Sequence, residues 1–188
     1  MTPRERIMAA TLACVERWGL GKTSLEDVAR EAGLSRATVY RHFPGGRDQV
    51  VSETITWEVG RFWASLAEEV APIDGLAPKL ARGLTFGNQT IHEHRLLQQI
   101  LNSEPELLLA ELTTSSPLVF AVLRDTIAAM LASEPLRPGV DVGEAADYVA
   151  RMFYALVGSP GSWDLGDPTE VDRLVRTELL AGIVAVRD

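Results

Sequence analysis

The sequence has a single cysteine among its 188 residues, so no disulfide can form within the chain. A lone cysteine fits a reducing compartment. Cys14 falls on one stripe of the first helical pattern, together with Ile7, Ala10 and Trp18. This position favours a small buried apolar side chain over a redox sensor.

Long apolar runs are missing as well. No segment approaches the length of a membrane span, and the opening MTPRERIMAA lacks the apolar centre of a signal peptide. We therefore expect a cytoplasmic protein. The 46% hydrophobic and 23% charged residues exclude a disordered chain.

The chain also lacks an excess of positive charge, since its formal net charge is −8. The acidity is unevenly distributed. Residues 1–56 contain 8 Lys/Arg and 7 Asp/Glu, which leaves 10 and 19 for the remainder. An N-terminal segment near neutrality can still bind nucleic acid if its arginines converge on one face, while an acidic remainder discourages unspecific binding. Scattered arginines on a solvated surface remain the alternative.

Catalytic spacings are absent too. GLGKTS at 19–24 has Glu16 where a phosphate-binding loop requires glycine, and GSPGS at 158–162 lacks the glycine spacing of a hydrolase elbow. His92 and His94 are two apart, so they would point to different sides of a helix. We predict no enzyme, no metal site and no cofactor.

What is present is the segment TSLEDVAREAGLSRATVYRHF at 23–43. Thr23 and Glu26 have the spacing of a capping box, which predicts a helix start there. Gly33 can adopt the left-handed conformation that ends this helix. Ser35 is the expected cap of a second helix, in which Val39 and Phe43 face inward; the outer positions are Arg36, Ala37, Thr38, Tyr40, Arg41 and His42. Two short helices joined in this way form a helix-turn-helix, which predicts sequence-specific DNA binding.

This segment, with YRHFPGGRDQVV at its end and the helical pattern before it, resembles the TetR family of bacterial transcriptional regulators. The resemblance covers about the first quarter of the chain. One departure is that Gly45 and Gly46 both precede Arg47, where many relatives have one small residue.

The helix-turn-helix and the resemblance together predict roles for individual residues on DNA. Arg36 could bind guanine through two hydrogen bonds, while Ala37 and the Thr38 methyl could touch a thymine methyl. The resemblance implies phosphate contacts for Tyr40 and His42. The full expected set is Thr23, Ser24, Ser35, Arg36, Ala37, Thr38, Tyr40, Arg41, His42 and Arg47, with Arg41 suited to base or phosphate and Arg47 to phosphate. Lys22 is either a phosphate ligand or a flexible surface charge.

Beyond residue 47 the patterns predict only helices, at about 47–70, 75–90, 95–102, 105–113, 117–133, 143–158 and 169–186. The expected fold is therefore all-α. The resemblance implies a three-helix DNA-binding domain at 1–46 and a helical effector-binding and dimerisation domain at 47–188. LLAGIVAV at 179–186 is apolar on every side, which indicates cover either by a second subunit or by its own lobe. The resemblance implies a homodimer that pairs the last two helices, bound to a palindromic operator.

The resemblance also implies a small-molecule effector among the middle helices, whose binding tilts the long connecting helix and releases the DNA. Candidate lining residues are Trp57, Phe62, Trp63, Phe86, Asn88, Gln89, His92, Phe120, Met130, Phe153, Tyr154 and Trp163. Aromatic residues at helical spacing also commonly fill interiors, and the three polar residues could simply be exposed. The predicted function is a repressor; the alternatives are an activator, or a helical small-molecule binding or interaction protein without operator recognition.

Overall fold

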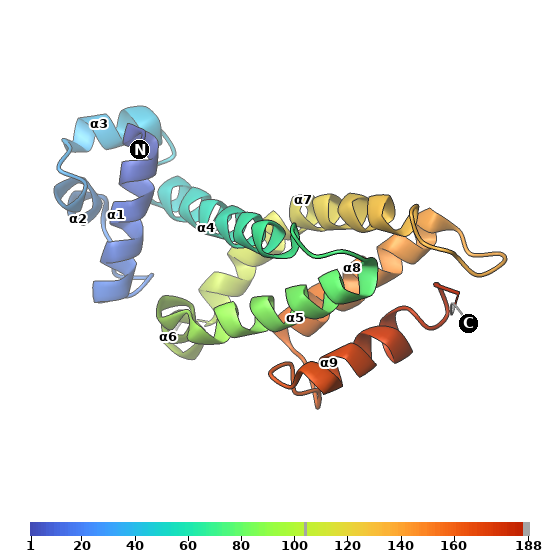
Figure 1. Ribbon diagram of the computed structural model, residues 1–188. Coiled ribbons are helices and arrows are strands. Elements are labelled where there is room, and N and C mark those ends of the chain that lie inside the picture. Colours follow the sequence, from blue (N-terminus) through green and yellow to red (C-terminus); the bar gives the residue numbers. More distant parts are fainter. Residues whose placement is uncertain (104, 186–188) are drawn as a thin grey trace. The chain divides into compact units, whose positions relative to one another are not determined.

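The computed structural model describes residues 1–103 and 105–185, and in this part of the chain all the regular structure is helical (Figure 1). The all-α prediction is confirmed. Apart from the helices, the described residues form one isolated antiparallel bridge, between Leu136 and Val184. The elements are α1 (Pro3–Trp18), α2 (Leu25–Glu31), α3 (Arg36–His42), α4 (Gly46–Val70), α5 (Leu76–Glu93), α6 (Arg95–Ser103), α7 (Pro105–Leu131), α8 (Val142–Gly158), α9 (Pro168–Leu174) and the π-helical turn η1 (Val175–Leu179).

Two compact units share these helices. The N-terminal unit comprises Met1–Phe62 and His94–Ser116, and the C-terminal unit comprises Trp63–Glu93 and Pro117–Asp188. Both α4 and α7 therefore contribute to each unit. The expected division of functions at residue 46 stays a prediction.

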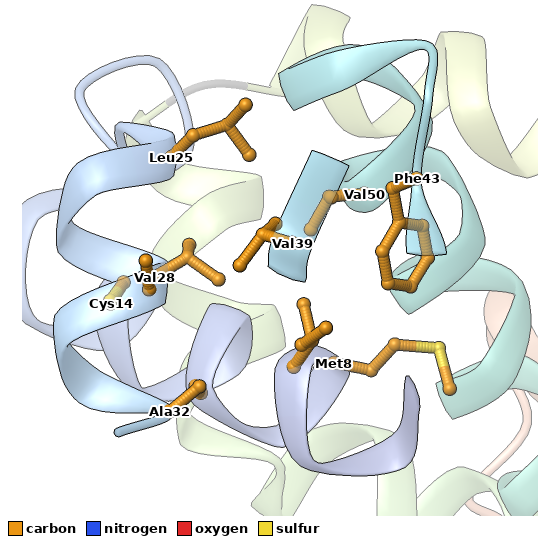
Figure 2. Packing of buried hydrophobic residues seen from close by; sticks show 11 residues of the cluster. Met8, Cys14, Leu25, Val28, Ala32, Val39, Phe43 and Val50 are labelled. Carbon is orange, nitrogen blue, oxygen red and sulfur yellow. The ribbon is translucent and has the colours of Figure 1, made fainter. Parts of the chain in front are cut away.

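In the N-terminal unit, α1 packs against α2 and α2 against α3. Their shared core is built from small and medium apolar side chains, and Figure 2 shows Val39 among them, between Val28 of α2 and Val50 of α4. Val39 and Phe43 are completely buried, as the spacing on α3 predicts. The core thus fixes which face of α3 remains outside.

Helix α2 begins one residue later than the sequence suggests. Its cap is Ser24, whose Oγ accepts a hydrogen bond from the Asp27 amide at 3.2 Å. Thr23 is buried and its hydroxyl donates to the Gly19 carbonyl at 2.8 Å. The predicted capping box of Thr23 with Glu26 is therefore wrong, because the threonine hydroxyl closes the preceding turn instead.

The turn between α2 and α3 follows the prediction. Gly33 has a φ of 61°, in the left-handed region that glycine adopts without steric cost. The amide of Leu34 then donates to the Ala29 carbonyl at 2.9 Å, which closes the end of α2. Ser35 caps α3, with its Oγ accepting from the Thr38 amide at 3.1 Å.

Burial also determines the state of Cys14, which is fully enclosed in the N-terminal core. Removal from water raises the pKa of the thiol, with Glu31 and Asp27 adding to the effect. The neutral thiol is thus favoured, and the prediction of a small buried apolar side chain is confirmed.

Two helix boundaries differ from the sequence prediction. The expected helices at 105–113 and 117–133 are one continuous helix, α7, with Pro117 in its interior. A proline inside a helix removes one backbone hydrogen bond but does not always end the helix.

The second difference concerns the C-terminal helix, which was expected to extend to residue 186. Regular α-helix ends at Leu174, η1 follows, and turns begin after Leu179. The Ala185 amide donates to the Pro135 carbonyl at 2.7 Å, and the Arg137 amide donates to the Ile183 carbonyl at 2.9 Å. The apolar segment therefore folds back on its own unit, where Leu179, Leu180 and Ile183 are buried; residue 186 lies outside the described residues.

In the C-terminal unit, two glycines of α5 allow close packing against α8. On α5, a Cβ at Gly83 would lie 2.9 Å from Cζ of Phe153, and a Cβ at Gly87 would lie 3.0 Å from a methyl of Val157. Both partners belong to α8, which packs against α5 (Figure 1). The absence of side chains at these two positions lets the helices approach.

We expect Gly83→Ala to lower the free energy of unfolding of the C-terminal unit by about 1–3 kcal/mol, because the buried Phe153 ring must move to admit the methyl group. This loss exceeds the gain in helix propensity, which is at most about 1 kcal/mol. Urea unfolding followed by the fluorescence of Trp63 and Trp163, with Trp18 and Trp57 replaced by phenylalanine, measures the change.

Gly60→Ala is the control for helix propensity, since a Cβ at Gly60, on the part of α4 that belongs to the N-terminal unit, would meet no atom within 4 Å. It should raise the stability of the N-terminal unit by about 0.5–1 kcal/mol through helix propensity alone. Equal stabilisation by both substitutions would show that α5 and α8 pack more loosely than described.

Candidate DNA-binding surface

Helix α3 presents one continuous polar face. Its exposed positions are Arg36, Ala37, Tyr40 and Arg41, and Thr38 and His42 are half-buried at its sides. Ser35 and Thr38 also share a hydrogen bond between hydroxyls at 3.0 Å. The structure therefore brings the residues predicted for base reading together on the side of α3 that faces away from the core.

Arg36 is held in place by groups from two helices. Its Nη1 forms an ion pair with Glu26 of α2, and its Nη2 donates to the Tyr40 hydroxyl at 3.3 Å. The guanidinium carbon also lies 5.4 Å from the centre of the Tyr40 ring. The hydrogen bond to Tyr40, followed by the charge of Glu26, raises the pKa of Arg36. Arg36 is thus oriented before any ligand arrives.

The other cations of the helix-turn-helix fall into two groups. Arg17 pairs with Glu31 and Arg30 pairs with Asp27, so their charges are balanced locally. Lys22 and Arg41 are exposed, and neither side chain forms an ion pair or hydrogen bond with the residues that the structure describes. These two side chains can therefore approach an anion without breaking an internal contact.

Arg47 points back into its own domain. Its Nε donates to the Thr23 carbonyl at 2.8 Å, its Nη2 donates to the Leu20 carbonyl at 2.5 Å, and its Nη1 lies 3.2 Å from Asp48. The guanidinium thus ties the start of α4 to the turn between α1 and α2. The Gly45–Gly46 pair precedes it, with Gly46 in the left-handed region at a φ of 72°. The contact of Arg47 with phosphate that the sequence suggests stays a prediction.

We expect Arg47→Ala to lower the free energy of unfolding of the N-terminal unit by about 1–3 kcal/mol, because two backbone carbonyls lose a charged donor. Urea unfolding followed by the fluorescence of Trp18 and Trp57, with Trp63 and Trp163 replaced by phenylalanine, measures this loss. Lys22→Ala is the control, since an exposed side chain without internal partners should change stability by less than about 0.5 kcal/mol. Equal effects of the two substitutions would contradict a structural role for Arg47.

A second structural arginine was missed by the sequence reasoning. Arg4 of α1 donates from Nη1 to the His42 carbonyl at 2.7 Å and pairs with Glu53 of α4. Its guanidinium carbon lies 4.3 Å from the centre of the Phe43 ring. Arg4 therefore holds the C-terminal end of α3, where carbonyls lack helical partners. No local pattern signals this role, because the partners are about forty residues apart.

Thr23 and Ser24 were expected to offer hydroxyls to DNA. The Thr23 hydroxyl is enclosed and bonded to the Gly19 carbonyl, so the structure does not present it at the surface. A contact of Thr23 with DNA, through its backbone N–H, stays a prediction. Ser24 is half-buried, and its hydroxyl donates to Asp27 at 2.5 Å. That bond, followed by the contact with Arg30, lowers the pKa of Asp27.

The residues expected to line an effector site separate between the two units. Trp57 packs on the N-terminal core, beneath the guanidinium of Arg61, and Phe62 belongs to the same unit. In the C-terminal unit, Trp63 stacks on Tyr154 with ring centres 6.0 Å apart and lies 6.5 Å from Phe153. The other predicted members of that unit are Phe86, Asn88, Gln89, His92, Phe120, Met130 and Trp163.

The polar candidates on α5 differ in their surroundings. Gln89 and His92 are exposed and satisfied, by Glu93 at 2.9 Å and by the Asn88 carbonyl at 2.8 Å. The Asn88 side-chain nitrogen is buried, and no described residue forms a hydrogen bond with it. A buried donor without a partner costs about 1–3 kcal/mol, so it is a candidate for contact with a ligand.

Two further features of the described residues bear on function. None of their helices combines the length and hydrophobicity needed to cross a membrane. No cluster of three or more histidine, cysteine, aspartate or glutamate residues suited to a metal ion occurs among them.

Comparison with known proteins places this surface in context. Residues 7–54 match the family model described as bacterial regulatory proteins, tetR family. An uncharacterized HTH-type transcriptional regulator of Mycobacterium bovis is 37% identical over 70 residues, which are 37% of this chain and 34% of that protein. The chain thus matches only about a third of the length of that curated relative.

Solved structures extend the likeness of fold to nearly the whole chain. The TetR family repressor AlkX from Dietzia has a TM-score of 0.65 at 21% identity, with 96% of each chain covered. The transcriptional regulator FadR from Bacillus subtilis, in complex with stearoyl-CoA, has a TM-score of 0.56 at 18% identity, covering 95% of this chain and 98% of that one.

Proposed function

We propose that this chain, whose residues 7–54 match the model of the tetR family of bacterial regulatory proteins, is a DNA-binding repressor released from a palindromic operator by a small-molecule effector. The observation that carries the proposal is helix α3. Its core side, Val39 and Phe43, is fully buried, and its opposite side gathers side chains of the types that can read base edges and contact phosphates.

The roles on DNA follow from exposure and from existing contacts. Arg36 is the candidate for a bidentate contact with guanine, beside Ala37 and the Thr38 methyl for thymine. Tyr40 and His42 are the candidates for contacts with phosphates. Arg41 and Lys22 add the cations that no internal partner neutralises. The remaining expected contacts are those of Ser24, Ser35 and Arg47.

We propose a homodimer formed through α8 and α9. Helix α8 buries one side in its own unit and leaves Tyr148 and Tyr154 exposed by 44% and 37%. Exposed aromatic side chains of this kind are frequent anchors of subunit contacts. A two-fold dimer would place two copies of α3 about 34–36 Å apart, one turn of DNA.

We propose that the effector binds within the C-terminal unit, where the unpartnered Asn88 nitrogen supplies a polar group beside an otherwise apolar helix face. The stearoyl-CoA complex of Bacillus subtilis FadR supports the view that this fold can accommodate a small molecule. Because α4 is shared by both units, a ligand that shifts it would change the position of the DNA-binding helices. Effector and operator must then weaken each other's binding equally.

This role needs a cytoplasmic location and no catalytic residue. The alternative is a helical small-molecule binding or interaction protein that has the helix-turn-helix but recognises no operator. It predicts uniform, weak and salt-sensitive binding to every duplex.

Selection of bound sequences from random duplex DNA tests the proposal. We expect a palindrome whose half-sites lie about 10 base pairs apart, centre to centre. Gel-shift titration of the selected duplex against random competitor then gives the affinity ratio, and the same titration with Arg36→Ala and Arg41→Ala combined is the control. No enrichment at moderate ionic strength would favour the alternative.

A further inference from the structure

Glu26 lies in the first turn of α2, outside the set of residues expected to touch DNA. Its carboxylate pairs with Nη1 of Arg36, the main candidate for base reading on α3. Both side chains are more than half exposed, at 54% and 57%. An exposed pair contributes only about 0–1 kcal/mol to stability, so the fold does not depend on this contact.

The pair restricts the guanidinium from one side while Tyr40 restricts it from the other. The Tyr40 hydroxyl accepts from Nη2 at 3.3 Å, so the two terminal nitrogens have partners on different helices, Glu26 on α2 and Tyr40 on α3. A long arginine side chain normally loses rotamer freedom when it binds. Here Glu26 and Tyr40 restrain the planar group on both sides, so part of that loss has occurred before binding.

The negative charge of Glu26 also affects whether Arg36 binds a phosphate or a base. A free arginine on this face would bind any nearby phosphate, which strengthens binding to every sequence alike. Glu26 neutralises Arg36 and repels phosphate oxygens at the same place. A guanine offers two neutral acceptors in one plane, which the guanidinium can approach without bringing a phosphate against the carboxylate.

We propose that Glu26 is a specificity-determining residue, which positions Arg36 for base reading and suppresses its contact with phosphate. This inference rests on the proposed function. Glu26 acts through Arg36, so it is a positioning residue and need not touch the DNA.

The substitution Glu26→Gln tests it, with dissociation constants measured for the selected operator, for the same operator with the base pair read by Arg36 replaced, and for random DNA. We expect affinity for random DNA to rise about five- to ten-fold, the size of one additional phosphate contact. The ratio of operator to random affinity should fall about ten-fold, and the slope of binding against salt concentration should steepen by about one.

Glu31→Gln is the matched control, because it removes one carboxylate from the same helix but releases Arg17 of α1. It should leave the affinity ratio unchanged. In the Arg36→Ala background, Glu26→Gln should have no effect on the ratio, which a role through overall charge would not predict.

The two hypotheses fail in different ways. If the unaltered protein shows no operator preference, the proposed function is wrong. If the unaltered protein prefers the operator and Glu26→Gln changes all three affinities by the same factor, as Glu31→Gln does, the positioning role of Glu26 is overturned. Circular dichroism and urea unfolding confirm that both variants fold.

Discussion

Phe43→Ala is expected to lower the free energy of unfolding of the N-terminal unit by about 3–5 kcal/mol, because truncating a buried aromatic side chain loses its transfer energy and leaves a cavity. Phe43 is fully buried in the core shared by α1 to α4, and its ring carries the Arg4 guanidinium. A loss of this size is a large part of the stability of a typical domain, about 5–15 kcal/mol. Operator binding should fall in parallel, since α3 ends at this ring.

Urea unfolding measures the loss if each unit is followed separately. With Trp63 and Trp163 replaced by phenylalanine, fluorescence comes only from Trp18 and Trp57, which pack on the N-terminal core. This separation is needed because a chain of two units need not unfold in one step.

Leu101→Ala is the control for Phe43→Ala, since the leucine is exposed on α6 of the same unit. Its effect should stay within about 0.5 kcal/mol. If Phe43→Ala cost no more than this, the inward position of Phe43 would be wrong, and with it the orientation of the face assigned to DNA.

The sequence was sufficient to predict the helix-turn-helix because its signals are local. Val39 and Phe43 are four apart, Gly33 stands where only a left-handed residue closes the helix, and Ser35 has the side chain of a cap. Each of these features depends on residues within one or two helical turns. The same holds for α5, α6 and α8, whose starts and ends lie within a few residues of the prediction.

The N-terminal cap of α2 was harder to predict, since Thr23 and Ser24 are both good capping residues and each has an acidic residue three positions later. The structure selects Ser24, because the Thr23 hydroxyl finds the Gly19 carbonyl in the turn before the helix. Competition between two similar side chains depends on where the preceding helix ends, which spacing alone does not determine.

Contacts between distant residues account for most of what the sequence could not predict. Arg4 and Arg47 look like surface cations suited to phosphate, yet both bind backbone carbonyls of their own unit. The pairing of Glu26 with Arg36 likewise requires knowing how α2 and α3 cross. Charge counts along the chain cannot separate arginines that hold the fold from arginines that are free.

The C-terminal segment shows the same limit for apolar residues. The run from Leu179 is apolar on every side, which fits a helix covered by a partner and equally a chain buried in its own unit. The structure shows the second arrangement, with Val184 bridged to Leu136. The proposal of a dimer through α8 and α9 therefore rests on the exposed tyrosines of α8 and on the likeness of residues 7–54 to the tetR family model.

Arg36→Ala is expected to reduce operator affinity by about 1–3 kcal/mol, or about five- to 150-fold, and to relax base preference at one position in each half-site. The reason is geometric. A guanidinium restrained by Glu26 and Tyr40 presents a planar set of donors to the two guanine acceptors. With alanine at this position only water can hydrogen-bond to those acceptors. Competition titrations with the four base pairs at that position measure both effects, and affinity for random DNA should change little.

Arg41→Ala provides the contrast on the same helix. Arg41 is exposed and has no internal partner among the described residues, so its removal should weaken all duplexes about equally and flatten the salt dependence by about one. The comparison is informative because the two substitutions remove identical charges from one helix. If Arg36→Ala also weakened all sequences equally, the restraint by Glu26 and Tyr40 would have no role in base reading, and the reading face would have to be assigned to other residues of α3.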